Sequence, residues 1–269
     1  MRTFIGALRY EWIRLRSVRS TWLLVFSAMA SAGLVAEIVA RDINRGEDFV
    51  SDPETVVSML TGSSGVGPLS FPALFAGLIG VAALGTEYRH RLMQTTLTAI
   101  PRRGVLLSAK LLVVAMFAGF TALLSVGIAF AVARIELGPV VDANLLRAGH
   151  TDRALGGFLA LVVLTAVLGV AFGALLRSAA AAGVALIALP ALIEPLAIWA
   201  LTGPGSRTGD DIARHLPFTA GAQMVNLPGG DGPGFNLVSL GALAGGLTFL
   251  AFVGVCALLS SAIFARRDA

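Results

Sequence analysis

Long apolar runs divided by polar loops dominate this sequence and restrict what it can fold into. About twenty helical residues, rising about 1.5 Å each, cover the roughly 30 Å of hydrocarbon in a bilayer. Runs of this length recur along the chain, and the mean hydropathy is +0.83. Charged residues make up 13% of the 269 residues, against about 25% in soluble domains. The pattern predicts an all-α polytopic membrane protein.

Six apolar runs are predicted to be transmembrane helices. Their approximate ranges are residues 21–40, 68–85, 105–133, 154–176, 179–200 and 236–264. Six crossings would leave both termini on the same side of the membrane. We expect a single transmembrane domain over residues 1–269, in which residues 201–235 form an outer segment before the last helix.

Basic residues gather in one set of loops. Thirteen of the 20 Lys and Arg residues, but only 3 of the 16 Asp and Glu residues, lie in residues 1–19, 87–110, 177–178 and 265–269. Because positively charged loops stay in the cytoplasm, we predict cytoplasmic termini in the plasma membrane of a prokaryote. Topology and contacts with lipid headgroups then explain the net charge of +4. No nucleic-acid-reading motif occurs, so a nucleic-acid partner is not expected.

Residues 1–20 are predicted to form an amphipathic helix on the inner membrane surface. Its apolar face carries Phe4, Ile5, Leu8, Trp12 and Leu15. Arg2, Arg9 and Arg16 repeat every seven residues on a neighbouring face. An apolar face beside a cationic one is typical of an interfacial helix. The alternative is a cytosolic leader with an incidental apolar stripe.

Two glycine pairs suggest close packing between helices. Gly169 and Gly173, and likewise Gly241 and Gly245, are four residues apart in apolar runs. Small residues at this spacing let two helix backbones approach each other closely. We therefore interpret both pairs as candidate helix–helix contacts.

Residues that carry chemistry are scarce in the sequence. There is no GxxxxGK[ST] loop for nucleotide binding, and Lys110 is the only lysine. Neither HExxH nor GxSxG occurs. His90, His150 and His215 fall on loops predicted to face opposite sides, which argues against a shared metal site. We expect no catalytic, cofactor-binding or metal-binding residues and no enzymatic activity in this chain.

Glu194 is a carboxylate in the fifth apolar run, between Pro190 and Pro195. A charge at membrane depth is costly and often marks function. However, prolines break or kink helices, so we expect the helix to end near one of them and to leave Glu194 wet at the outer surface. The alternative is a buried, functional carboxylate. The only other acidic residue in the spans is Glu37, so we expect little buried charge and no strongly ionic substrate.

The stretch from Glu87 to Lys110 is the longest loop predicted to lie inside the cell. One face of a short helix could be formed by Leu92, Met93, Thr96, Leu97 and Ile100. Pro101 would end that helix, since the residue before a proline avoids the α conformation. Its rim would be formed by Arg89, Arg91, Arg102 and Arg103. An apolar centre with a charged rim is typical of a docking surface; the alternative is a connector that only sets topology.

This loop resembles the first cytoplasmic loop of type-2 ABC exporter permeases, the membrane subunits of drug, lipid and polysaccharide export systems. The matching residues are Glu87, Tyr88, Arg89, Leu92, Pro101, Arg102, Arg103 and Lys110. Arg91 replaces the glycine that the family usually carries. The segment HLPFTAGAQM and the terminal RRDA are also similar, and as topology the resemblance covers nearly the whole chain.

The resemblance implies a permease driven by a separate ATPase. Two permease copies, identical or related, would assemble with two ABC ATPase subunits, which bind the ATP and Mg. Residues 86–104 would be the cytoplasmic coupling loop. Its contact residues would be Glu87, Tyr88, Arg89, Arg91, Leu92, Met93, Leu97, Pro101, Arg102 and Arg103. The interfacial helix, with Trp12, Arg9 and Arg16, would also touch the ATPase.

The resemblance further implies a permease domain in which the segment 201–235 is re-entrant. In the mechanism that follows from it, the kinked region 190–235, with Pro190, Glu194 and Pro195, would form the outer gate. The expected function is ATP-driven export of an amphiphilic drug, lipid or peptide. Two alternatives remain open at this point: a stand-alone secondary carrier or channel, and a membrane scaffold that transports nothing.

Overall fold

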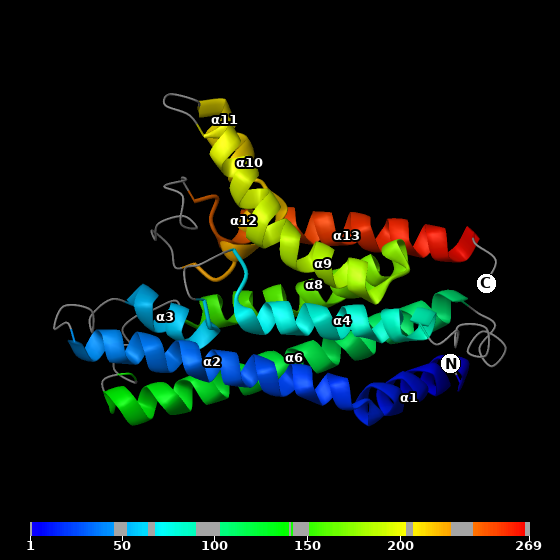
Figure 1. The fold of residues 1–269 in the computed structure, drawn as a ribbon, viewed down its shortest axis with the longest axis horizontal. Helices are drawn as coiled ribbons and strands as arrows, with labels where there is room; N and C mark the ends of the chain where they lie inside the picture. The colour runs from blue at the N-terminus through cyan, green and yellow to red at the C-terminus, as the bar shows by residue number, and fades with distance from the viewer. Residues whose placement is uncertain are drawn as a thin grey trace.

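The computed structural model describes residues 2–45, 53–63, 68–89, 103–139, 141, 151–202, 207–226 and 239–266. Over these residues the chain is a bundle of helices (Figure 1). The long helices are α1 (Arg2–Ser17), α2 (Arg19–Arg45), α4 (Phe71–Arg89), α6 (Arg103–Leu137), α8 (Thr151–Leu176) and α13 (Ala242–Arg266). The shorter ones are α3 (Pro53–Thr61), α9 (Ala179–Ala188), the π-helix η2 (Leu189–Ile193), α10 (Glu194–Leu201), α11 (Arg207–Ala213) and α12 (Pro217–Ala222).

Five stretches within the described residues are long and apolar enough to cross a membrane. They are Arg19–Ile43, Gly104–Leu137, Thr151–Leu176, Ala179–Leu201 and Ala242–Ile263. This confirms the prediction of an all-α, multi-pass membrane protein. The second predicted span is α4, whose apolar part Phe71–Gly85 is shorter than the others. Fifteen residues cover only about 22 Å, so the count of six crossings stays a prediction.

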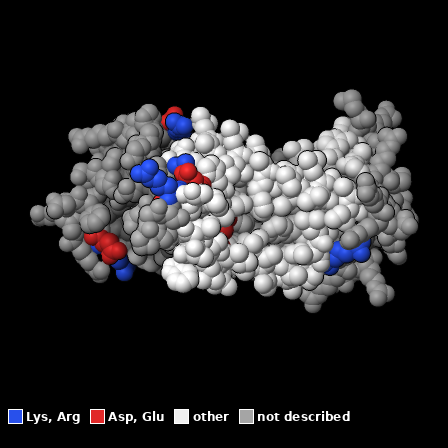
Figure 2. Space-filling view, turned by 90° about the horizontal axis from the view of Figure 1, so that it is seen from above, with Lys and Arg blue, Asp and Glu red and all other residues white. Residues whose placement is uncertain are grey.

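On the face shown in Figure 2, charged side chains are absent from a broad zone of the bundle. A zone without visible Lys, Arg, Asp or Glu separates the charged residues toward one end from the basic residues at the other end. Such a zone is what a hydrocarbon layer requires, because an unpaired charge there is costly.

Both chain termini lie at the same end of the bundle, beside the end of α4 and the start of α6 (Figure 1). We call this the inner end and the opposite one the outer end, following the predicted orientation. The tight turn predicted at Arg177 and Ser178 also occurs: α8 ends at Leu176, and α9 begins at Ala179. Arg177 adopts a left-handed φ of 54°, and the Ser178 side chain caps α9 by accepting a hydrogen bond from the Ala181 N–H.

Helices α4 and α8 pack with their backbones almost in contact. A Cβ atom added to Gly80 would lie 2.0 Å from the Ala166 carbonyl oxygen, and one added to Gly169 would lie 2.0 Å from the Gly77 carbonyl oxygen. The prediction of close packing at Gly169 is therefore confirmed. This contact buries the apolar part of α4 inside the bundle.

The second predicted glycine contact holds for one of its two residues. A Cβ on Gly245 would lie 2.3 Å from the Ala220 carbonyl oxygen, so α12 packs directly on α13. Gly241 instead precedes α13, has a φ of +81° and would meet nothing within 4 Å. Its role is to turn the chain, and the prediction of a helix contact there is wrong.

Candidate functional site at the inner end

Helix α1 packs on the bundle through a face that the sequence pattern did not single out. Ala7, Glu11 and Leu15 are buried and lie four residues apart. Of the predicted apolar stripe, Ile5 is 60% exposed and Trp12 39% exposed, as a membrane-facing stripe would be. Leu15 is buried instead, and Leu8 is partly buried against the core. Contact of the stripe with a membrane surface stays a prediction, and beside it lies a second face that carries a buried carboxylate.

Aromatic rings hold α1 against α6. The Trp12 ring lies 4.9 Å from the Phe117 ring, and the Trp22 ring of α2 lies 6.5 Å from the same phenylalanine. The Trp22 indole N–H donates to the Arg16 carbonyl over 2.8 Å. The Arg9 and Arg16 side chains are exposed, as predicted for residues that face headgroups or a partner. These contacts fasten the end of α1 to the start of α2.

A buried ion cluster joins α1, α4 and α6. The Lys110 Nζ of α6 lies 2.8 Å from Glu11 Oε1 of α1, and these side chains are 1% and 0% exposed. The same ammonium group donates to the Ala83 carbonyl of α4 over 3.2 Å. One lysine therefore bridges the other two helices.

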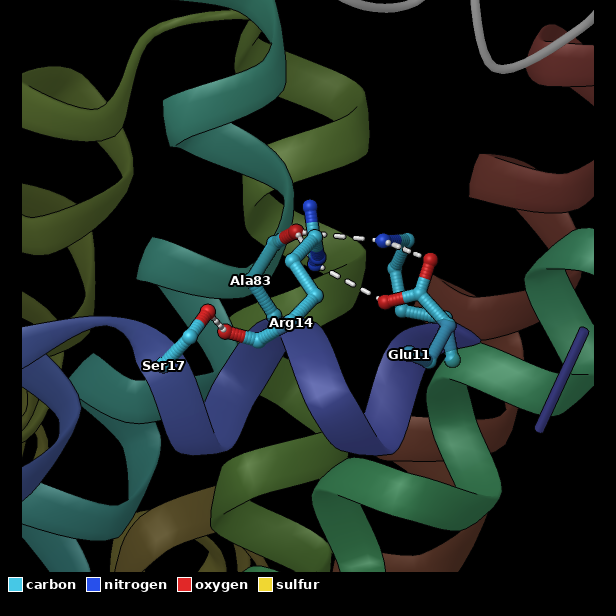
Figure 3. Close-up of polar contacts among 5 residues, drawn as sticks. Glu11, Arg14, Ser17 and Ala83 are labelled. Atoms are coloured by element: carbon cyan, nitrogen blue, oxygen red, sulfur yellow. Dashed lines mark hydrogen bonds and ion pairs between the residues drawn. The ribbon is translucent and has the colours of Figure 1, made fainter. Parts of the chain in front are cut away.

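Arg14 completes the cluster. Its guanidinium lies 2.9 Å from Glu11 Oε2 and also donates to the Ala83 carbonyl oxygen. Figure 3 shows Glu11 and Arg14 projecting from α1 toward Ala83, and the Ser17 hydroxyl bonded to the Arg14 carbonyl at the end of the helix. Each carboxylate oxygen of Glu11 thus faces a different cation.

Pairing is what makes these charges tolerable. Removing an ion from water costs several kcal/mol unless an opposite charge and hydrogen bonds compensate, and here both are present. The cluster corrects the expectation of little buried charge in the bundle. The sequence offered one sign that these two residues are unusual: Lys110 is the only lysine, and Glu11 is the only acidic residue before Glu37. No sequence rule pairs two residues that are 99 positions apart.

The cluster lies close to the predicted coupling loop. Helix α4 continues through Glu87 and Tyr88 to Arg89, and α6 begins at Arg103. Ala83 precedes the end of α4 by six residues and Lys110 follows the start of α6 by seven, about 10 Å along each helix. The remaining predicted contact residues, Arg91, Leu92, Met93, Leu97, Pro101 and Arg102, lie outside the described residues.

At the outer end, Glu194 is buried rather than wet. It is 5% exposed, and its carboxylate accepts hydrogen bonds from the Phe218 N–H (2.8 Å), the Thr219 N–H (2.7 Å) and the Thr219 hydroxyl (2.8 Å). The expectation of a solvent-exposed carboxylate is wrong. The donors come from the first turn of α12, where backbone N–H groups have no partner within the helix.

The two prolines do not end the fifth span. Pro190 lies in the π-helix η2, whose wider turn accommodates the residue that cannot donate. Pro195 lies in the first turn of α10, where its missing N–H costs little. The helix therefore continues to Leu201, and the chain returns through α11 and α12 to cover Glu194. The short helices α11 and α12 lie within the predicted outer segment 201–235, of which 203–206 and 227–235 are outside the described residues.

Gln223 is a buried polar residue that sequence reasoning missed. Its side-chain oxygen accepts a 2.6 Å hydrogen bond from the Leu240 N–H, just before α13. It follows α12 directly, so it ties the segment that covers Glu194 to the last helix. Nothing in the sequence around this glutamine indicated that its side chain would bond to the start of the last helix.

Metal binding finds no support in the described part of the chain, which brings together no group of three or more His, Cys, Asp or Glu residues that could hold an ion. His215 lies in the turn after α11, while His90 and His150 fall outside the described residues. The chain matches no protein-family model and no curated protein.

Proposed function

We propose that the chain is the membrane-spanning permease subunit of an ATP-driven ABC exporter. It crosses the membrane six times with cytoplasmic termini, and the coupling loop of residues 86–104 docks on a separate ATPase subunit. The observation that carries this proposal is the ion cluster of Glu11, Arg14 and Lys110, which fastens α1 to the two helices that flank the docking segment.

The cluster gives a mechanical reason for this assignment. A push on residues 87–103 acts on the end of α4 and the start of α6. Lys110 links both of these helices to Glu11, so α1, α4 and α6 would move together as one body. A force applied by a partner that closes on ATP would thus reach three helices at once.

The outer gate is assigned to the arm of α9, η2 and α10. In Figure 1 this arm leans away from the bundle toward its α11 end. A π-helical turn at Pro190 is a place where a helix can bend, and Glu194 holds the first turn of α12 beside it. Two permease copies would form the path between them, for an amphiphilic drug, lipid or peptide.

The first experiment tests the docking segment. The tagged chain is purified with its ATPase from native membranes, and the associated protein is identified by its nucleotide-binding sequence. We expect Leu97→Asp and Arg102→Glu to abolish association, while Arg41→Glu at the outer end leaves it unchanged. Full association and full export in both docking variants would refute the proposal.

The second experiment separates the permease from the alternatives. Substrate efflux is measured from cells with and without the chain, and transport is measured in liposomes with and without the ATPase. A permease requires both subunits and ATP. Transport by the chain alone would identify a secondary carrier or channel, and ATPase binding without efflux would identify a scaffold.

A further inference from the structure

A groove of about 530 Å³ runs between the outer halves of α8 and α13. This volume lies within the range of about 300–1,000 Å³ typical of small-molecule sites. One wall comes from α8, including Gly156 and Ala160, and the other from α13, including Leu247. Met224, from the turn after α12, also lines the groove, and Arg153 lies at its outer end.

Glycines create this groove. A Cβ on Gly157 would lie 1.8 Å from the Met224 carbonyl oxygen, so the α12 turn packs directly on the α8 backbone. A Cβ on Gly246 would lie 3.4 Å from the Met224 side chain. Gly156, by contrast, would meet nothing within 4 Å. Met224 therefore packs against both helices on one side of the groove. The space beside Gly156 is open.

The walls of the groove are apolar and belong to membrane-spanning parts of both helices. From Arg153 to Leu164 the groove follows α8 for about 16 Å, roughly one leaflet. On the opposite wall, Leu243 and Leu247 are 73% and 65% exposed. Such surfaces at membrane depth are suited to an alkyl chain.

The outer end of the groove has the opposite character. Arg153 is exposed in the first turn of α8 and forms no ion pair or hydrogen bond within the described part of the chain. The positive end of the α8 dipole lies at the same place, although the carboxylate of Asp152 is adjacent. An arginine guanidinium pairs well with a phosphate group, often through two hydrogen bonds.

We propose that this groove binds a phospholipid of the outer leaflet, with one acyl chain against α8 and α13 and the phosphate on Arg153. A long apolar slot with a single cation at its interfacial end matches an amphiphile with an anionic head. The proposal does not rest on the export function, because the site lies in this chain alone and needs no ATPase.

The test uses native mass spectrometry on the full chain with added phosphatidylglycerol or with diacylglycerol, which carries the same chains without phosphate. We expect one bound phosphatidylglycerol and weaker retention of diacylglycerol. Arg153→Ala should reduce the affinity for phosphatidylglycerol about fivefold and leave the affinity for diacylglycerol unchanged. Arg153→Lys keeps the positive charge and should retain most of the wild-type affinity for phosphatidylglycerol. Gly156→Leu should abolish binding of both lipids, since its side chain enters open space in the groove.

Two matched variants control for general effects. Gly127→Leu also adds a side chain where a Cβ would meet nothing within 4 Å, but on α6, and Arg41→Ala removes a cation at the outer end of α2. Both should retain wild-type lipid binding. Equal binding of the two lipids in every variant would overturn the proposal. So would a Gly156→Leu variant that turns a dimer into a monomer and leaves lipid binding unchanged, because the groove would then be an interface between two copies.

Discussion

Glu11 and Glu194 are two buried carboxylates that the molecule stabilises in different ways. Glu11, at the inner end, is paired with the cations of Lys110 and Arg14. Glu194, at the outer end, is bonded to two backbone N–H groups and one hydroxyl group, from Phe218 and Thr219. Both are almost inaccessible, at 0% and 5% exposed.

The difference teaches how each end can move. A carboxylate that loses a charged partner in a buried site leaves an uncompensated ion, and this strongly destabilises the fold. A carboxylate held by neutral donors loses less when a donor is removed, since each such bond contributes about 1–3 kcal/mol. The contact at the inner end is therefore expected to hold its three helices together, and the contact at the outer end to separate at a lower cost.

The largest effect is expected at the inner pair. Lys110→Ala leaves Glu11 with Arg14 as its cation, so we expect a loss near 3 kcal/mol, at the low end of the range for a broken buried pair. Unfolding of the purified protein in mixed micelles measures it. The charge-swapped variant Glu11→Lys with Lys110→Glu should recover part of the loss. A change below about 1 kcal/mol would show that the pair is not buried as described.

A smaller effect is expected from Glu194→Ala, which removes the acceptor for three donors at once. We expect a net loss of about 2 kcal/mol, because the cost of three unpaired donors is partly offset by the desolvation cost that the buried carboxylate no longer carries. Hydrogen exchange should become faster in α12 alone. Glu194→Gln keeps one acceptor oxygen and should recover more than half of the exchange protection. If Glu194→Ala left the exchange of α12 unchanged, the contact with Phe218 and Thr219 would not hold this helix.

Arg14→Met sharpens the comparison within the ion cluster. The methionine keeps an unbranched apolar stem, and Lys110 still neutralises Glu11, so we expect a loss of about 1–2 kcal/mol. The same unfolding measurement applies. A loss as large as that for Lys110→Ala would mean that the two cations contribute equally, contrary to the deeper burial of Lys110.

The smallest effect is expected from Thr219→Val. It removes the hydroxyl donor while the Phe218 and Thr219 amides still bond to Glu194, so we expect about 1 kcal/mol. Comparing the hydrogen exchange of α12 in Thr219→Val and Glu194→Ala shows how much of the stabilisation comes from the hydroxyl donor and how much from the two backbone donors. If Thr219→Val had the same effect as Glu194→Ala, the two backbone donors would contribute nothing to holding Glu194.

Much of the fold follows from local patterns. The helical spans at 21–40, 105–133 and 154–176 lie within α2, α6 and α8, because an apolar run of this length in lipid must satisfy its backbone hydrogen bonds internally. The short turn at Arg177 follows from the two polar residues there. The candidate site was predicted only in part: the stretch around residues 86–104 was singled out, but the cluster beside it was not.

The sequence by itself determined the class of protein, the approximate limits of its helices and the uneven charge of its loops, because these depend on local composition and on the solvent around each segment. Only the tertiary structure decided that Glu11 meets Lys110, that Glu194 is covered by α12, and that α4 lies against the glycines of α8. Those contacts join residues far apart in the chain, and a buried charge or a glycine does not indicate its partner until the helices are packed.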